Sequence, residues 1–485
     1  MKNISFSLIL STLICLAVNG QVRQPHSLYF METIPQISQV NPAHQPRANG
    51  YVILPLNFNI DLMSDIAVKD VFQQKGNNWY TPLEEQYEYK KLRNSIGKKA
   101  TMVNLGLDWD IFGFGFRAGN GYVSFGLSQH ITGGFALPSD LFKITEDFFP
   151  DRTKLDFSPL RAKALMYTQL RFGYSGKINE NLTVGINVKP LMGQAAATSQ
   201  FEKSSIRTGV DKWVFDSEGT LKFSGPVELE LDDEGKISDS KSTLDDLEDM
   251  DILKKYLFDF SNPGIAFDFG AEYRINDRLT ASAALNNLGF ISWKNDLNGI
   301  TYNGSYEFDG MDFDVAKDDN DFDFDEIADA MNYEVNHDKF KTGLAPSLNL
   351  GASYMLTKAV SAGFTSRTVF WQNAVRQSFN MSLYVQPYSF VAFNAGATYQ
   401  LKGNVYLGGG FMFLLGPLQF YLLGDYAPVY LSTVRFDTDK ETGSETKYIP
   451  LRQKSFTYRL GFNLIFGRHG YVDKPMLNKG KSSWN

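Results

Sequence analysis

Residues 265–274 read Ile-Ala-Phe-Asp-Phe-Gly-Ala-Glu-Tyr-Arg, and this alternation of apolar residues with small or polar ones decides the fold class. Successive side chains of a β-strand point to opposite faces, so the alternation predicts one apolar face and one face carrying Asp268, Glu272 and Arg274. Three further segments have the same two-residue period: residues 123–131, 182–189 and 348–354. The pattern therefore predicts amphipathic strands.

Alternation of this kind fits both a secreted β-sandwich and a membrane β-barrel. The length of the segments, about ten residues, and their number favour the barrel. The chain contains 39 Phe, 24 Tyr and 41 Gly, and its mean hydropathy is only −0.24. No window after residue 20 is apolar for the length of a transmembrane helix. We expect an all-β fold, a transmembrane antiparallel β-barrel.

Fourteen strands can be counted along the chain, an even number that leaves both chain ends on the periplasmic side. They are expected to start near residues 50, 101, 121, 163, 181, 264, 279, 346, 359, 376, 389, 404, 418 and 455. Short polar turns follow Tyr273, Tyr354 and Tyr399. Strict parity puts the Tyr399 turn on the opposite side from the other two, so a pair of strands between residues 359 and 415 could be miscounted.

The remaining connections are long and acidic, and we expect them to be extracellular loops because outer-membrane barrels have short periplasmic turns. They cover roughly residues 62–100, 134–161, 201–262, 295–345 and 434–453.

The N-terminus has the layout of a cleaved secretory signal peptide: Lys2, an apolar run from Ile4 to Val18, and small residues before Gln21. A retained membrane anchor is the alternative. The only cysteine, Cys15, lies within that run, so a processed chain would have no disulfide. The expected organisation is a signal peptide at 1–20, an N-terminal periplasmic plug or hatch at 21–49, the barrel at 50–467 and a periplasmic tail at 468–485.

Reaction chemistry has little support in the sequence. The formal net charge of −7 argues against a nucleic-acid partner. His130 is expected to face the lumen near Ser128, and lumen lining is favoured over a hydrolytic Ser/His pair. The acidic stretch 318–326 departs from the EF-hand template and is more typical of a solvated loop than of a calcium site. Residues 244–257 predict a short amphipathic helix. We expect no enzyme activity, catalytic residue, cofactor or metal.

The last strand carries a pattern similar to the barrel-assembly signal, in which polar, glycine, hydrophobic and aromatic residues have a fixed spacing. Here these positions are Arg459, Gly461, Leu464 and Phe466. The signal predicts the barrel-assembly machinery as a partner, although a polar tail follows it instead of the chain end.

The segment Asn41-Pro42-Ala43, directly before the first strand, resembles the N-terminal hatch of FadL-type fatty-acid channels and similar segments of PorV-like and PorP-like secretion and gliding barrels. Residues 288–293 and 416–425 look like recurring strand segments of an uncharacterised family of such barrels. The resemblance implies an outer-membrane channel for small molecules, with hydrophobic molecules among the candidates. Its alternative is an accessory barrel that docks envelope or secretion partners through its loops. For the hatch itself, a structural cap over the periplasmic mouth of the barrel is favoured over a ligand gate.

Overall fold

The structure is a computed structural model. It describes residues 24–75, 78–80, 87–88, 90, 92, 94, 100–143, 153–209, 212–225, 227–231, 237–242, 258–308, 332–371, 374–401, 405–429, 432–437, 444–449 and 453–468. The signal peptide with Cys15, the amphipathic helix at 244–257, the acidic stretch at 318–326 and nearly all of the C-terminal tail lie outside these residues.

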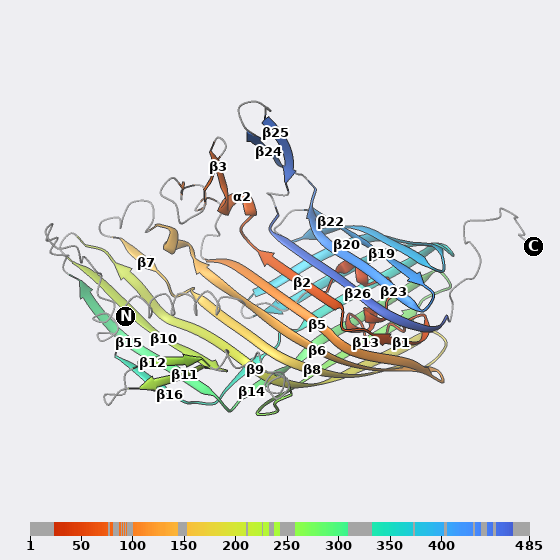
Figure 1. Cartoon of the computed structure of the whole chain (residues 1–485), viewed down its shortest axis with the longest axis horizontal. Coiled ribbons are helices and arrows are strands. Elements are labelled where there is room, and N and C mark those ends of the chain that lie inside the picture. The colour runs from red at the N-terminus through yellow and green to blue at the C-terminus, as the bar shows by residue number, and fades with distance from the viewer. Residues whose placement is uncertain are drawn as a thin grey trace, which may run out of the picture.

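Fourteen antiparallel wall strands close into a barrel within the described residues (Figure 1). The first wall strand consists of β1 (Ala48–Ile53) and β2 (Asn57–Ser64). The others are β5 (Ala100–Ala118), β6 (Gly121–Pro138), β8 (Arg161–Lys177), β9 (Leu182–Arg207), β13 (Asn262–Arg274), β14 (Leu279–Trp293), β18 (Ser347–Thr357), β19 (Val360–Trp371), β20 (Ala374–Tyr388), β21 (Val391–Gln400), β22 (Val405–Leu415), β23 (Leu418–Pro428) and β26 (Ser455–Arg468). The last strand closes the ring because β26 pairs with β23 on one side and with both β1 and β2 on the other.

Smaller elements complete the described chain. They are η1 (His26–Leu28), η2 (Pro35–Gln39), α2 (Val68–Val71), β3 (Gln73–Lys75), β4 (Asn78–Tyr80), η3 (Ser139–Lys143), β7 (Lys154–Asp156), β10 (Trp213–Ser224), β11 (Val227–Leu231), β12 (Ile237–Ser242), β15 (Leu297–Phe308), β16 (Tyr333–Asn336), β17 (Phe340–Gly343), β24 (Ser432–Asp437) and β25 (Ser444–Ile449).

The first wall strand is interrupted at residues 54–56. Ile53 pairs with Asn463 and Phe58 pairs with Leu460, so five steps along this strand face three steps along β26. The surplus residues bulge out of the ladder, and the indole Nε1 of Trp109 donates to the carbonyl of Pro55 at 2.7 Å.

Every wall strand begins within two residues of its expected start, and the count of fourteen is confirmed. Tight turns follow β5, β8, β13, β18, β20 and β22 at one end of the barrel, which we call the short-turn end. The opposite end is the long-loop end. Because antiparallel strands alternate in direction, the connection from Gln400 to Val405 lies at the long-loop end. The Tyr399 turn is therefore at the opposite end of the barrel from the turns after Tyr273 and Tyr354, as strict parity requires. No pair of strands was miscounted.

Two of the expected long loops contain strands that extend the barrel wall. The first half of β9 pairs with β13 and its second half with β10, which in turn pairs with β15. Residues 201–262 and 295–345 are thus not loops throughout, and Figure 1 shows β10, β15 and β16 reaching beyond the barrel at its left end. The described side chains of β10 are nearly all half-buried. Trp213, Phe215, Leu221 and Phe223 alternate with mostly polar residues, so the two-residue period continues within the expected loop.

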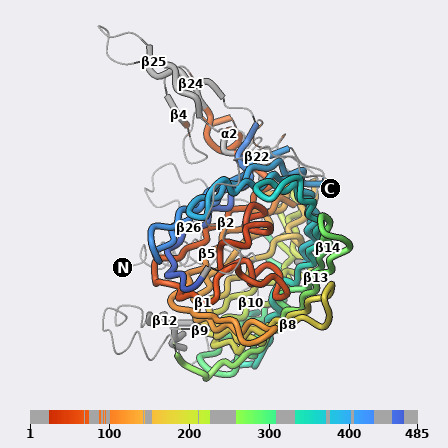
Figure 2. The backbone as a smooth tube through the Cα atoms, turned by 90° about the vertical axis from the view of Figure 1, so that its right-hand side faces the viewer, coloured from red at the N-terminus to blue at the C-terminus, as the bar shows by residue number. Residues whose placement is uncertain are grey.

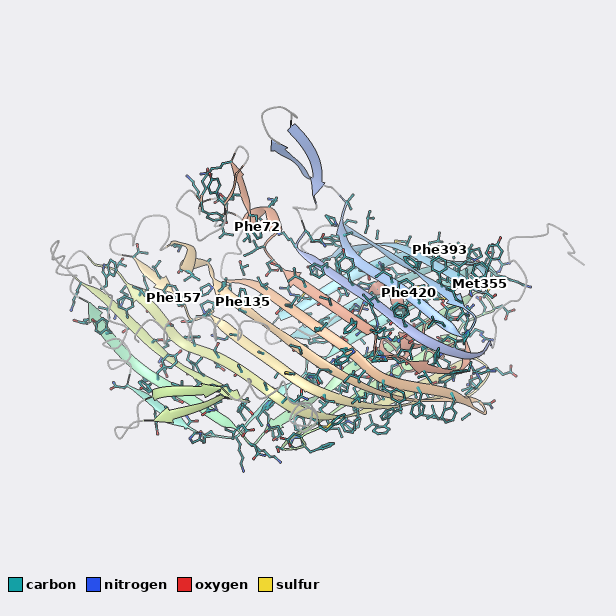
Figure 3. All side chains as sticks on the ribbon, in the orientation of Figure 1. Phe72, Phe135, Phe157, Met355, Phe393 and Phe420 are labelled. Carbon is teal, nitrogen blue, oxygen red and sulfur yellow. The ribbon has the colours of Figure 1, made fainter. Side chains whose placement is uncertain are left out.

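Large apolar side chains are exposed around most of the outer face of the barrel. They include Phe114 and Phe116 of β5, Phe172 of β8, Phe269 of β13, Phe290 of β14, Leu350 of β18, Phe364 of β19, Met381 of β20, Phe393 of β21, Leu415 of β22, Leu422 of β23 and Phe466 of β26. Phe393 and Met355 are labelled on this surface in Figure 3. An apolar band flanked by aromatic residues is typical of outer-membrane barrels, and the fold suggests that location.

Among the described residues no helix has both the length and the apolar character needed to cross a membrane.

Residues 24–47, here called the N-terminal segment, lie inside the barrel. Figure 2 looks into the barrel from the short-turn end and shows this segment as a red tube coiled within the ring of strands. Leu28, Met31, Ile34 and Ile37 are each 0 % exposed. They pack on inward-facing apolar residues of the wall, namely Tyr51, Ile53, Tyr122, Tyr384, Ala392, Met412, Leu414, Tyr421, Leu423 and Ile465. The barrel therefore has an apolar core at its short-turn end in place of a polar lumen.

Candidate functional site

The Asn41-Pro42-Ala43 turn sits directly on the barrel wall. The side-chain Oδ1 of Asn41 accepts a hydrogen bond from the backbone N–H of Ala43 at 2.9 Å, which closes the turn. A Cβ added at Gly185 would lie 2.2 Å from the Pro42 carbonyl oxygen, and one added at Gly270 would lie 2.1 Å from Asn41 Oδ1. The close approach of this turn depends on two wall glycines.

The ring of His44, just after this turn, is buried. Its Nε2 lies 3.3 Å from Glu272 Oε2, while burial lowers the pKa of His44 to about 4 against the opposing effect of the Glu32 carboxylate. His44 is therefore neutral near pH 7.

Buried side-chain hydrogen bonds attach the N-terminal segment to distant strands. His26 lies between the hydroxyls of Thr365 and Ser378, each 3.0 Å from a ring nitrogen. The amide of Gln36 donates to Asn57 Oδ1 at 3.1 Å and to Asn463 Oδ1 at 2.8 Å. The segment thus contacts both the first and the last wall strands, and it holds its place without joining the ladder.

A cavity adjoins this segment on the side toward the long-loop end. It encloses about 1040 Å³ of empty space, counted with the open water at its mouth. Polar and charged groups dominate its lining: Gln24, Gln39, Asp108, Asp110, Ser128, His130, Thr132, Lys163, Gln169, Arg171, Lys189, Asn286, Asn287, Ser347, Asn349 and Arg367. Apolar contributions come from Val40, Leu165, Tyr167, Leu344 and Val369. The cavity lining is therefore mainly polar, with a smaller apolar share.

Arg459 links the N-terminal segment to the wall of this cavity. Its Nη2 donates to Asp110 Oδ2 at 2.6 Å and to Gln39 Oε1 at 2.9 Å, and its Nη1 donates to Gln24 Oε1. Tyr421 is a further partner through its hydroxyl, 3.2 Å from Arg459 Nε. Both charged groups are buried, with side-chain exposures of 2 % for Arg459 and 10 % for Asp110.

A second chain of hydrogen bonds joins three residues of β5 and β6 at the cavity surface. Asp108 Oδ1 lies 2.6 Å from His130 Nδ1, and Ser128 Oγ lies 2.9 Å from His130 Nε2. His130 was expected to face the lumen near Ser128, and the structure places both there. Sequence reasoning missed Asp108.

A one-residue bulge explains why Asp108 was missed. Next to the tight turn between β5 and β6, Ala118 pairs with Gly121. Moving away from that turn, the register is regular as far as the pair Phe112 and Leu127. The register then shifts, so Asp110 pairs with Ser128 and Asp108 with His130. An unbroken ladder would have paired Asp108 with Ile131, whose side chain is exposed on the outer face. The surplus Ile111 therefore brings the carboxylate to the histidine.

The four residues of the assembly pattern divide between the two faces of β26. Arg459 and Gly461 point inward, and Leu464 and Phe466 point outward. A Cβ on Gly461 would lie 1.7 Å from Asn57 Oδ1, so this glycine is required by packing inside the barrel. Within the described residues no cluster of potential metal ligands occurs.

A family model matches residues 42–425, most of the chain and nearly all of the barrel. The chain belongs to this family, described as a family of unknown function (DUF5723). The match begins at Pro42 within the N-terminal turn and ends at Asp425, before the last wall strand. No curated protein matches the sequence.

Solved structures similar to this DUF5723 barrel include a transporter and a channel. The toluene transporter TodX of P. putida is 10% identical with a TM-score of 0.40, covering 88% of this chain and 93% of its own. A FadL homologue of Pseudomonas aeruginosa is 13% identical with a TM-score of 0.42, and the match covers 93% of this chain and 98% of the homologue. The monoaromatic hydrocarbon channel CymD is 11% identical with a TM-score of 0.40, and the match covers 90% of this chain and 94% of CymD. Likeness at this level says nothing about what the present barrel carries.

Proposed function

We propose that this chain is an outer-membrane channel for small polar solutes, closed at its short-turn end by the N-terminal segment. The observation that carries the proposal is the polar cavity within the barrel, directly against that segment. A solute entering from the long-loop end would reach the cavity and could go further only when the segment moves.

The way in which the segment is held supports a gating role. Residues 24–47, all of them described, form no strand, so the segment can leave without breaking the wall ladder. Its polar contacts are separate hydrogen bonds, and each contributes on the order of 1 kcal/mol. The apolar cluster around Ile34 and Ile37 opposes release and would keep the channel closed at rest.

The cavity lining favours a polar cargo over the hydrophobic one that the FadL-type resemblance implies. Hydrophobic ligand sites are lined mainly by apolar and aromatic side chains with a few polar groups. Here the lining includes Asp108, Lys163, Lys189 and Arg367, so an apolar solute would displace water from charged groups without replacing their hydrogen bonds.

Export and insertion are part of the same proposal. A cleaved signal peptide at residues 1–20 would deliver the chain across the inner membrane, and the pattern ending at Phe466 would present it to the barrel-assembly machinery. The outward apolar band supports lipid as its surroundings.

Conductance across planar lipid bilayers tests this function. The purified full-length barrel is compared with a variant lacking residues 24–47 and with Arg459→Ala, which keeps the segment but removes two of its contacts, those of Gln24 and Gln39. We expect rare openings in the wild type, frequent openings in Arg459→Ala and a larger steady conductance in the deletion. A folded deletion variant that conducts no better than the wild type would rule out gating by the segment.

The wall extension favours a second candidate, an accessory barrel that docks another envelope protein. The sheet formed by β9, β10 and β15 reaches beyond the barrel at the long-loop end (Figure 1). Its strands are joined by antiparallel ladders, so it offers a partner an ordered surface. Cross-linking in intact outer membranes, followed by purification of the barrel, tests this. Recovery of the barrel without a specific partner would count against docking.

A further inference from the structure

We propose that Ser128, His130 and Asp108 form a hydrolytic site that cleaves small carboxylic esters inside the barrel. This activity goes beyond transport and departs from the expectation that the chain has no catalytic residues. Its basis is the order of contacts described above, in which Ser128 Oγ, the two ring nitrogens of His130 and Asp108 Oδ1 are joined by distances of 2.9 and 2.6 Å. A nucleophile, its base and the carboxylate that orients the base are recognised by this geometry, whatever their order in the sequence.

The carboxylate of Asp108 is fixed from two sides. Its Oδ1 contacts His130, while its Oδ2 accepts hydrogen bonds from Gln24 Nε2 at 3.0 Å and from Asn59 Nδ2 at 3.1 Å. A carboxylate held in this way requires the proton of a neutral imidazole to be on Nδ1. The lone pair of Nε2 then points to Ser128 Oγ, as a general base requires.

The imidazole ring is also held in orientation. His130 stacks on Tyr167 with ring centroids 4.9 Å apart and an interplanar angle of 17°. Ser128 and His130 are two residues apart on β6, so their side chains share the inner face, and the β5 bulge sets Asp108 directly opposite. All three groups stand on paired strands, which position side chains more firmly than loops.

Two neighbours suggest which substrates the site would accept. Gln169 pairs with Ser128 across the β6–β8 ladder, and its Nε2 lies 3.4 Å from Ser128 Oγ, so this amide is placed to donate to an oxyanion formed there. Lys163 also lines the cavity, and its ammonium donates to the Gly343 carbonyl at 2.8 Å. An ester with an acidic substituent would find a cation there, beside the apolar side chain of Leu165.

The reaction follows from these positions. Ser128 Oγ attacks the ester carbonyl as its proton passes to His130 Nε2, and the negative charge develops on the carbonyl oxygen. The C–O bond to the alcohol breaks, and the alcohol leaves with the proton from His130. Water then attacks the acyl-serine, giving its proton to His130, and the carboxylic acid leaves as the proton returns to Ser128 Oγ. Asp108 stays ionised as a positioning residue and stabilises the imidazolium.

A polar network that only fills the lumen would also contain these hydrogen bonds, so the test must detect nucleophilicity. The full-length folded barrel is incubated with a small alkyl fluorophosphonate, which a reactive serine attacks with formation of an O–P bond and loss of fluoride. Intact mass and peptide mapping then locate the label. We expect a single label on Ser128 in the wild type and none in Ser128→Ala. In His130→Asn the labelling rate should fall by at least about 100-fold.

Matched variants separate chemistry from structure. Ser124→Ala removes another inward serine of β6 outside the cavity lining and should label as the wild type does. Asp108→Asn should slow labelling by up to about 10⁴-fold and change its pH profile, because the amide no longer selects the reactive tautomer. Retention of the compact, heat-modifiable form on gels verifies folding of each variant. Absence of label on wild-type Ser128, or equal labelling rates in His130→Asn, would overturn the proposal.

Discussion

Gly185 and Gly270 lie opposite one another in the ladder between β9 and β13, and the Asn41-Pro42-Ala43 turn rests on both of them. Any side chain at either position would occupy the space of the turn. Two wall residues far from the N-terminus in sequence thus determine whether the segment fits into the barrel.

Gly270→Val should therefore displace the N-terminal segment while leaving the wall intact. The valine Cβ would overlap Asn41 Oδ1, and the turn cannot avoid it by shifting along the wall toward β9, because Gly185 is equally close. Hydrogen exchange should show faster exchange at residues 41–44 with little change in β9 and β13. Gly50→Ala is the matched control, since the nearest atom to its added Cβ is 3.4 Å away. Unchanged exchange at the turn in Gly270→Val would contradict this packing.

Arg459→Met should destabilise the barrel by about 3–5 kcal/mol, because removal of one partner leaves the Asp110 carboxylate buried without its counter-ion. The double variant Arg459→Met, Asp110→Asn should recover much of that loss, since no unpaired charge remains. Urea unfolding in lipid vesicles, followed by tryptophan fluorescence, measures the difference. If the double variant is no more stable than the single one, the charge pair is not the source of the loss.

Gly461→Ala should slow folding even in the absence of assembly machinery. The alanine Cβ would collide with Asn57 Oδ1, so the slower folding would come from disturbed packing on the inner face of the last strand. Phe466→Ala, on the outer face, should fold normally into pure lipid vesicles and lose efficiency only in cells. Comparison of vesicle folding rates with cellular outer-membrane levels tests both variants. Equal behaviour of the two in vesicles would show that packing at Gly461 has no part in the effect.

Met381→Arg should report whether the outer band meets lipid. This side chain is 70 % exposed on β20, and an arginine in a lipid-facing position near the bilayer midplane costs about 2–4 kcal/mol. Stability in vesicles should fall by that order, whereas Met381→Leu should change it little. A Met381→Arg barrel as stable as the wild type in lipid would mean that this surface does not face the hydrocarbon core.

The sequence was sufficient to place the wall strands because each carries an apolar face for lipid, as in residues 265–274. β10 carries the same period, since Trp213, Phe215, Leu221 and Phe223 alternate with mostly polar residues, but its side chains are half-buried on both faces, so the period alone does not distinguish a wall strand from this extension. The inner apolar cluster was hidden for another reason, because Tyr51 and Ile53 break the rule that lumen-facing residues are polar.

The candidate site shows a different limit. Period-two reasoning placed Ser128 and His130 inward, but the position of Asp108 depends on the bulge at Ile111. A single surplus residue exchanges the inner and outer faces of everything beyond it. In residues 100–118 the only mark of that shift is the adjacent apolar pair Ile111 and Phe112, where the apolar positions change from odd to even.

The hydrogen bonds of Gln36 to Asn57 and Asn463 also set an order of events during biogenesis. Asn57 belongs to the first wall strand and Asn463 to the last, and these strands meet only when the ring closes. The N-terminal segment leaves the ribosome before every strand, yet its binding place is completed by the final one. The binding place of the earliest part of the barrel to be made is therefore complete only after the last strand has paired.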